Sequence, residues 1–118
     1  MDVEIKNIDN VIIVTLLKSQ MDISTTDLMS HILKSSNVKA LVIDFSKINI
    51  IDSRMLASLL NLHIQLQKLN IPVIKVGVSF FINNLFEVTK IKELSTYYDT
   101  IEEAIENVNN NIAIIKNN

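Results

Sequence analysis

The sequence predicts an α/β domain in which about four helices pack on a mixed, mostly parallel sheet of four to five strands. Short runs of β-branched and other apolar residues alternate along the chain with longer segments of helical periodicity. Strands that alternate with helices pair in parallel through right-handed crossovers. The length of 118 residues is that of one ordinary domain, so we expect residues 1–118 to form a single unit.

The first part of the chain predicts a hairpin, a helix and a central strand. Residues 3–6 alternate between apolar and charged types and predict a short edge strand. We expect it to pair, across a polar turn, with the almost wholly apolar run 11–17. Residues 24–27 are Ser-Thr-Thr-Asp and offer several N-caps for a helix. The apolar run 40–45 is short enough for a central strand.

A long helix is predicted to begin at about Ser53, because apolar residues recur at helical spacing from Met55 to Leu69. Residues 72–78 form the next strand candidate, with Pro72 at the first position, where proline is tolerated. Residues 80–88 predict a short helix, and we expect Phe81, Leu85 and Val88 to be its inward-facing residues.

The last part of the chain predicts a short strand at 95–98 and a helix capped by Asp99 or Thr100. Glu102 and Glu103 lie in the first turn of that helix, where the helix dipole favours negative charge. The segment 107–118 is rich in asparagine and either extends the helix or frays.

Composition argues against several classes of function. The net charge of −2 gives no basic face for a nucleic-acid backbone, and an aromatic content of 5% gives few stacking surfaces. The absence of cysteine excludes disulfides and thiolate chemistry, and a single glycine cannot build a phosphate-cradling loop. Two histidines without ligand spacing predict no metal site. We therefore expect a protein that is not an enzyme and has no cofactor.

The N-terminus shows no signal peptide, and no apolar run is as long as a membrane span. These features predict a cytoplasmic protein without a membrane-spanning segment.

The most informative segment is 51–54, where an apolar stretch leads into the long helix. In the simpler interpretation, Asp52 or Ser53 caps the helix and satisfies an unpaired backbone N–H group. In the second, Ser53 accepts a phosphate that the helix N-terminus stabilises. Local chemistry alone favours the capping interpretation.

Four segments, in order, resemble the signature of the STAS family of anti-sigma factor antagonist domains. Residues 42–53 (VIDFSKINIIDS) are similar to the family's apolar strand ending in Asp, followed by a short loop and Asp-Ser at a helix start. The other three resemblances are found in 17–22 (LKSQMD), 80–91 (FFINNLFEVTKI) and 100–105 (TIEEAI). The resemblance therefore extends over most of the chain and implies a STAS-like fold.

The resemblance also implies a function and a site. In such proteins the serine after the aspartate is phosphorylated by a partner that is both anti-sigma factor and serine kinase, and a phosphatase resets the switch. Carried over, Ser53 is the phosphate acceptor. The partner-binding residues are Asp22, Asp52, Ser53, Arg54 and Met55. The implied role is transcription regulation by partner switching in a bacterium.

Four positions depart from the family pattern. Arg54 and Met55 stand where the family has a second small hydroxyl residue and a glycine, and Ser19 and Lys90 replace glycines of two loops. These departures leave two alternatives open. One is a non-switching STAS scaffold or accessory subunit of a signalling or transporter complex, and the other is a small-molecule or enzymatic α/β domain. The sequence does not identify the partner or pathway, nor whether the protein forms a homodimer.

Overall fold

The computed structural model describes residues 2–19, 23–35 and 37–117. Five strands form one sheet in the order β1-β2-β3-β4-β5. β1 is antiparallel to β2, and the remaining neighbours are parallel. In chain order the elements are β1 (Val3–Ile8), β2 (Val11–Leu16), α1 (Ile23–Ser35), β3 (Ala40–Asp44), α2 (Ser53–Lys68), β4 (Val73–Val76), α3 (Phe80–Thr89), the 3₁₀ helix η1 (Ile91–Leu94), β5 (Thr96–Tyr98) and α4 (Ile101–Asn117). The predicted fold class, with a mixed sheet and four α-helices, is confirmed.

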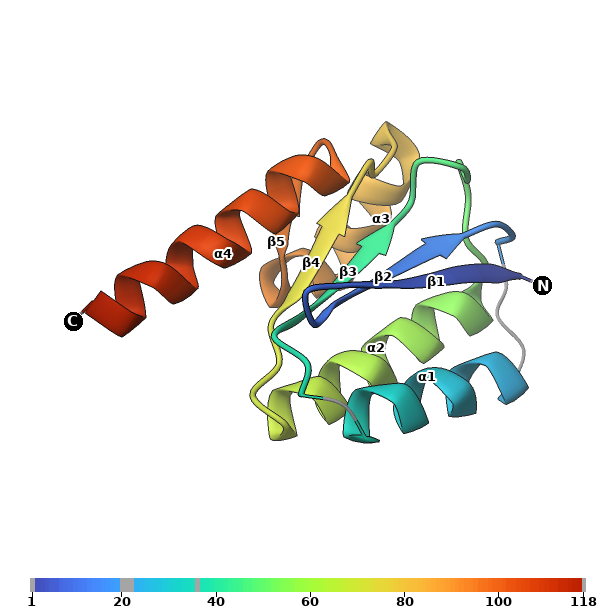
Figure 1. Cartoon of the computed structure of the whole chain (residues 1–118). Coiled ribbons are helices and arrows are strands. Elements are labelled where there is room, and N and C mark those ends of the chain that lie inside the picture. Colours follow the sequence, from blue (N-terminus) through green and yellow to red (C-terminus); the bar gives the residue numbers. More distant parts are fainter. Residues whose placement is uncertain (1, 20–22, 36, 118) are drawn as a thin grey trace.

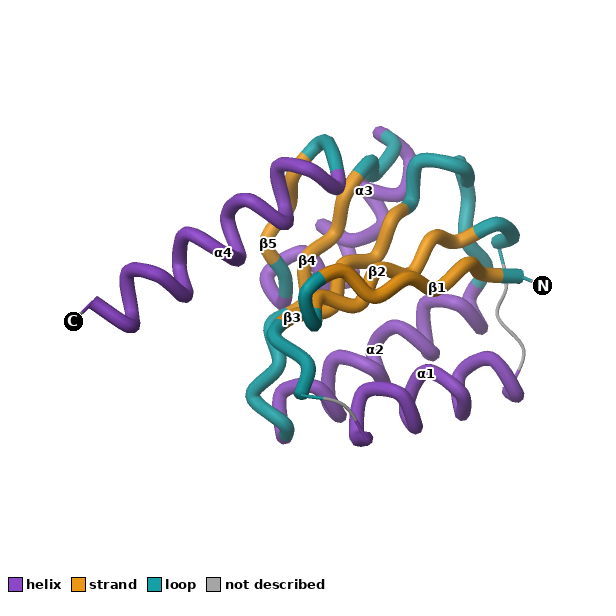
Figure 2. Tube along the Cα trace, viewed as in Figure 1, coloured by secondary structure: helices purple, strands orange, loops and turns teal. Residues whose placement is uncertain are grey.

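Helices cover both faces of the sheet, so the domain has three layers. Figure 1 shows α1 and α2 side by side beneath the sheet and α4 on its other face, with the C-terminal end of α4 extending away from the sheet. Figure 2 shows the same layers by element type. The larger core joins one face of the sheet to α1, α2, α3 and η1, and the smaller core joins the other face to Ala104 and Val108 of α4. β2 and β3 are buried along their whole length, which explains why their sequences are almost wholly apolar.

The predicted hairpin closes through a two-residue turn. Ile8 pairs with Val11, and the intervening Asp9 and Asn10 have φ angles of 51° and 68°. Positive φ at both central residues defines the turn type that matches the twist of paired strands, and Asp and Asn tolerate it well. The hairpin strand therefore extends to Ile8, two residues beyond the range that sequence alternation predicts.

The predicted inward face of α3 is wrong in two of its three residues. Phe81 is 74% exposed and Val88 is 82% exposed, whereas Leu85 is partly buried against the core. The buried residues of α3 are Ile82 and Phe86. Because apolar residues occur around almost the whole circumference of this helix, its periodicity does not define one face, and packing against the sheet decides.

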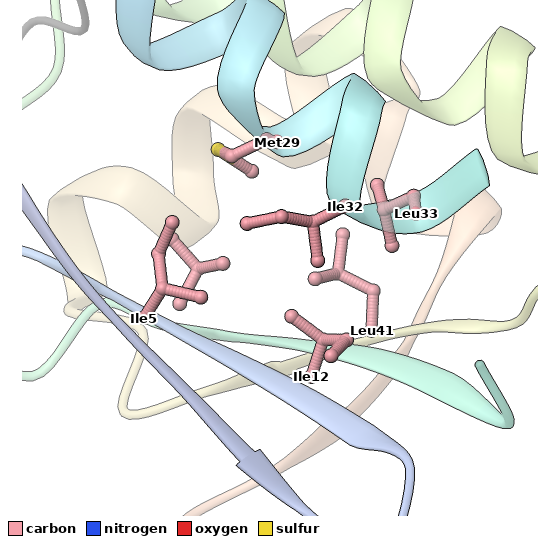
Figure 3. A pocket seen from close by; sticks show the side chains of 7 residues that line it. Ile5, Ile12, Met29, Ile32, Leu33 and Leu41 are labelled. Carbon is pink, nitrogen blue, oxygen red and sulfur yellow. The ribbon is translucent and has the colours of Figure 1, made fainter. Parts of the chain in front are cut away.

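A small apolar hollow remains between α1 and the sheet. Figure 3 shows side chains from β1, β2, β3 and α1 converging on it, including Ile5, Ile12, Met29 and Leu41. Its water-accessible volume is about 0 Å³, so it is too narrow to admit a water molecule. It is therefore a packing gap within the core and not a ligand site. None of the described helices combines the length and apolar character that a bilayer-spanning segment needs.

Candidate functional site

The loop between β3 and α2 is held in place from both sides. Ile48 and Ile51 are buried in the larger core, whereas Ile50 between them is 71% exposed. Asp44, at the end of β3, accepts a hydrogen bond from the backbone N–H of Ser46 at 2.9 Å. These contacts fix the conformation of the loop that leads to the start of α2.

A second loop packs closely against the first. Gly77, directly after β4, has a φ of +65°, and a Cβ there would lie 2.9 Å from Cβ of Ser46. The hydroxyl of Ser79 donates a hydrogen bond to the carbonyl of Asn49 at 3.3 Å. Because β3 and β4 are parallel neighbours, their carboxyl ends meet at one edge of the sheet. The loop that leads into α2 and the loop that leads into α3 are therefore in contact there.

Asp52 is the N-cap of α2, as the capping interpretation predicts. One oxygen of its carboxylate accepts a hydrogen bond from the backbone N–H of Met55 at 2.8 Å. The other oxygen lies 3.3 Å from a terminal guanidinium nitrogen of Arg54. The backbone hydrogen bond from Met55, with a further contribution from the Arg54 charge, lowers the pKa of Asp52 below its ordinary value. A negative charge is thus fixed beside the helix start.

Ser53 occupies the first position of α2, and its side chain is exposed. Its hydroxyl forms no hydrogen bond with any residue in the described ranges 2–19, 23–35 and 37–117. The cap is supplied by Asp52 instead, so the Ser53 hydroxyl is not needed to satisfy the helix. It is placed at the positive end of the helix dipole and open to an approaching molecule.

The next two residues point in opposite directions. Arg54 is exposed, and its guanidinium pairs with Asp52. Met55 is fully buried in the larger core. Its side chain is therefore a packing residue, and only its backbone N–H takes part in the helix start.

Asp22, the remaining residue of the predicted site, lies outside the described residues. The loop that leads toward it does reach the site, because the backbone N–H of Asp52 donates a hydrogen bond to the carbonyl of Ser19 at 3.4 Å. The structure thus brings the loop after β2 next to the start of α2.

Exposed apolar side chains surround this edge of the sheet. Phe80 and Phe81, the first residues of α3, are 73% and 74% exposed, and their rings meet edge to face with centroids 6.0 Å apart. Ile50 is exposed in the neighbouring loop. We call Ile50, Phe80 and Phe81 the apolar rim. Large exposed apolar side chains gathered at one place are typical of protein-binding surfaces.

A second polar cluster lies inside the larger core, and sequence reasoning missed it. The amine of Lys75, on β4, lies 2.9 Å from Nε2 of His63 on α2 and 2.6 Å from the hydroxyl of Ser95. The signal that could have revealed it is a lysine in the otherwise apolar strand 73–76, at a position that strand alternation places on the same face as Val73.

Comparison with protein families identifies a matching family model. The family model described as "STAS domain" matches residues 2–104 of the chain. A search of curated proteins finds no match.

Comparison with solved structures supports the same fold. A Ser→Glu variant of RsbS from Moorella thermoacetica superposes with a TM-score of 0.78 at 16% identity, covering 96% of this chain and 99% of that one. A putative anti-sigma factor antagonist from Thermotoga maritima has a TM-score of 0.74 at 22% identity and covers 91% and 94%. The anti-sigma factor antagonist SpoIIAA, in its unphosphorylated form, has a TM-score of 0.74 at 15% identity and covers 92% and 96%. At these identities the likeness is one of fold.

Proposed function

The chain belongs to the STAS domain family, and on this basis we propose that it is a protein-binding regulator of the anti-sigma factor antagonist type. In this proposal it binds an anti-sigma factor that is also a serine kinase, and phosphorylation of Ser53 releases the partner. The observation that carries the proposal is the exposed hydroxyl of Ser53 at the start of α2, which forms no hydrogen bond with a described residue and is flanked by the charged pair Asp52 and Arg54.

The surroundings of Ser53 suit a switch based on charge. A phosphate on Ser53 adds about 1.5 to 2 negative charges at neutral pH beside the carboxylate of Asp52. A partner surface that fits the unmodified site would then face two like-charged groups, and such repulsion weakens an interface. Arg54 is exposed, and its one ion pair with a described residue is the surface pair with Asp52, so it can turn from Asp52 to the phosphate, a stronger partner for a guanidinium.

The apolar rim can supply binding energy, which a switch based on charge alone does not provide. Exposed charged groups set orientation and on-rate, whereas buried aromatic side chains supply most of the binding energy of a typical interface. We propose that Phe80 and Phe81 are anchors for the partner and that Asp52, Ser53 and Arg54 form the part of the interface that phosphorylation disrupts. Asp22 belongs to the proposed contact set on the basis of family resemblance.

The wider setting is part of the same proposal. We infer a cytoplasmic bacterial regulator of transcription that is itself not an enzyme, that does not bind nucleic acid and has no membrane-spanning segment, and that a phosphatase resets. The net charge of −2 and the scarcity of aromatic residues support the absence of nucleic-acid binding.

The direct test is phosphorylation by a purified serine kinase of the anti-sigma factor class from the same organism, with Mg-ATP. We expect intact-mass measurement to show one added phosphate and peptide mapping to place it on Ser53. The Ser53→Ala variant should accept none. Ser46→Ala is the matched control, because Ser46 is exposed in the same loop and its removal should leave phosphorylation unchanged.

Binding gives the second half of the test. Ser53→Asp should weaken partner affinity about tenfold or more, since a fixed charge imitates part of the phosphate effect. Phosphate on Ser53 without any change in affinity would contradict the switch while leaving the binding role intact.

One observation favours a second candidate, a STAS scaffold that binds constitutively. Asp52 already caps α2 and pairs with Arg54, so the helix start is complete without any modification. In this case partner affinity depends on the apolar rim and not on the charge at residue 53. Phe81→Ala would weaken binding strongly, whereas Ser53→Asp would have no effect.

A further inference from the structure

Two basic side chains are buried together away from the Ser53 site. Lys75 is 0% exposed, and its amine contacts Nε2 of His63 and the hydroxyl of Ser95. The rings of Phe86 and Tyr97 lie over the amine, with centroids 5.0 and 5.4 Å away. Within the described part of the chain, neither Lys75 nor His63 forms an ion pair with a carboxylate. A buried basic pair without an acid is unusual, because buried charges are normally paired.

A cavity of about 290 Å³ opens beside this pair. His63 forms part of its wall, and four apolar residues form another part, namely Ile71, Pro72, Val73 and Leu94. The remaining lining residues are Gln67 and Glu93. Its volume is at the lower end of the range of small-molecule sites, so it suits a ligand of a few carbon atoms.

His63 can offer a hydrogen-bond donor to the cavity, because it forms part of the cavity wall and described residues engage only one of its ring nitrogens. All hydrogen bonds of its ring with described residues are made through Nε2. When the ammonium of Lys75 donates to Nε2, the ring proton resides on Nδ1. The nitrogen that remains for a ligand is therefore an N–H group, strengthened by the positive charge behind it.

We propose that this cavity binds a small aliphatic carboxylic acid as its carboxylate, with the negative charge on the Nδ1–H group of His63 and the hydrocarbon tail on the apolar wall. The carboxylate supplies the acid that the buried pair lacks. Gln67 lies one helical turn beyond His63, so its amide is placed to donate a second hydrogen bond.

The charges around the cavity decide in favour of an anion. Glu93 on η1 is exposed, so water screens its repulsion, whereas the positive charge of Lys75 lies in the low-dielectric core beside the neutral ring of His63. The other titratable group that faces Lys75 is Tyr97 on β5, whose hydroxyl is buried without a partner and is neutral. A phosphate would carry more charge toward Glu93 and would leave the apolar wall uncovered.

Binding of the carboxylate should be accompanied by the uptake of a proton. Burial lowers the pKa of Lys75 to about 7, and burial together with the Lys75 charge lowers the pKa of His63 to about 4. An adjacent anion favours the charged form of Lys75, so the bound state takes up a proton. Affinity should therefore rise by up to about tenfold per pH unit as the pH falls from 8 to about 7, and level off below pH 7, where Lys75 is already protonated in the free protein.

The test uses sodium butyrate and sodium isovalerate as probes, with sodium chloride at equal ionic strength as the reference. Titration calorimetry should give saturable binding that is tighter at pH 6 than at pH 8, and the ¹⁵N NMR resonances of His63 should move with the same dissociation constant. Absence of saturable binding, or a shift of His63 with chloride alone, would overturn the proposal.

Two variants and a control place the ligand. Lys75→Met keeps the length of the side chain but removes the charge, so it should weaken binding about tenfold and abolish its pH dependence. Glu93→Gln should tighten binding about threefold by removing the repulsive carboxylate. Lys92→Met, which removes a cation from the same 3₁₀ helix outside the cavity lining, should leave affinity unchanged. If Lys75→Met fails to fold, an unchanged affinity in Glu93→Gln is sufficient to reject this cavity as the site.

Discussion

Lys75 makes the stability of the protein depend on pH. Its pKa is about 7 in the folded protein, against an ordinary value of 10.5. The unfolded chain therefore binds this proton more tightly than the folded chain. The loss of folding free energy that this difference causes is fully present below pH 7. It diminishes as the pH rises toward 10.5, the pKa of the lysine in the unfolded chain. Between these limits, the free energy of unfolding should rise by about 1.4 kcal/mol per pH unit.

The measurement is denaturant unfolding at a series of pH values between about 7.5 and 9.5. The upper limit avoids the ionisation of Tyr97, whose pKa burial raises to about 12 from 10.0, so that it acts in the opposite direction above pH 10. The slope should be lost in Lys75→Met and retained in Lys92→Met, whose lysine is half-buried at the surface. An equal slope in both variants would show that Lys75 is not its source.

At the scale of single residues, the sequence predicts those features of the candidate site that depend on neighbouring residues only. Asp52 and Ser53 are adjacent, and a cap beside a hydroxyl at a helix start is visible without knowledge of the fold. Whether Met55 contacts a partner or the core could not be decided from the neighbouring residues, because it depends on how α2 is oriented against the sheet. Lys75, His63 and Ser95 come from three separate segments, and only the folded chain brings them together.

The end of α3 carries strain that a substitution can remove. Lys90 is the C-cap and has a φ of +64°, the left-handed conformation that glycine adopts without steric cost. It is one of the positions where the family resemblance expects glycine. Lys90→Gly should stabilise the protein by about 0.5–1 kcal/mol, because relief of the Cβ clash exceeds the added freedom of the unfolded chain.

Asn70 provides the matched control for this substitution. It has a φ of 57° but is a residue type that tolerates the left-handed region. Asn70→Gly should therefore give a smaller gain or none. Thermal unfolding of the two variants measures the difference, and a larger gain at Asn70 than at Lys90 would contradict the explanation.

The two faces of α3 should differ sharply in their effect on stability. Phe86 is fully buried, and its ring meets that of Phe45 with centroids 5.6 Å apart. Phe86→Ala should cost about 3–5 kcal/mol, because it leaves a cavity in the core. Phe81→Ala should change stability by about 0.5 kcal/mol or less, because the ring is exposed. Chemical denaturation of both variants tests the corrected orientation of this helix, and equal losses would contradict it.

At the scale of elements, the sequence predicts type and order better than orientation. The runs that form β2 and β3 are buried on both faces, so their composition alone identifies them. α2 has a clear stripe, and Met55, Leu59, Leu62 and Leu66 are buried as its periodicity predicts. Two other residues assigned to the stripe, Leu60 and Leu69, are exposed instead. α3 has no such stripe, and its orientation is set by packing that the local sequence does not contain.

The whole domain should open from its edges. β3 lies at the centre of the sheet, with helices packed on both faces, whereas β1 and β5 each have one unpaired edge. Amide hydrogen exchange should therefore be slowest in β2, β3 and β4 and faster in β1 and β5. Mass-spectrometric exchange under native conditions tests this order. Protection of β5 equal to that of β3 would indicate a partner strand along that edge.

At the scale of the whole molecule, the order of strands and helices was enough to predict the architecture. Parallel strands require crossovers; three of the four predicted helices lie between two consecutive strands, and the last follows the final strand. The existence of two separate cores was not predicted, because it depends on the packing of α4, which among the described helices is the one that covers the second face. That residues 107–117 continue α4 was also known only from the structure, because the sequence was compatible with either an extended helix or a frayed end.

The tight turn at Asp9 and Asn10 has a practical consequence. It joins β1 to the amino end of β2, so it lies at the amino ends of the parallel strands. The loop that leads to Ser53 lies at their carboxyl ends, on the opposite side of the domain. A fluorophore, an affinity tag or a biosensor surface attached there would leave the Ser53 edge facing free solution. The chain contains no cysteine, so a single one introduced at position 10 would be the only thiol available for such labelling.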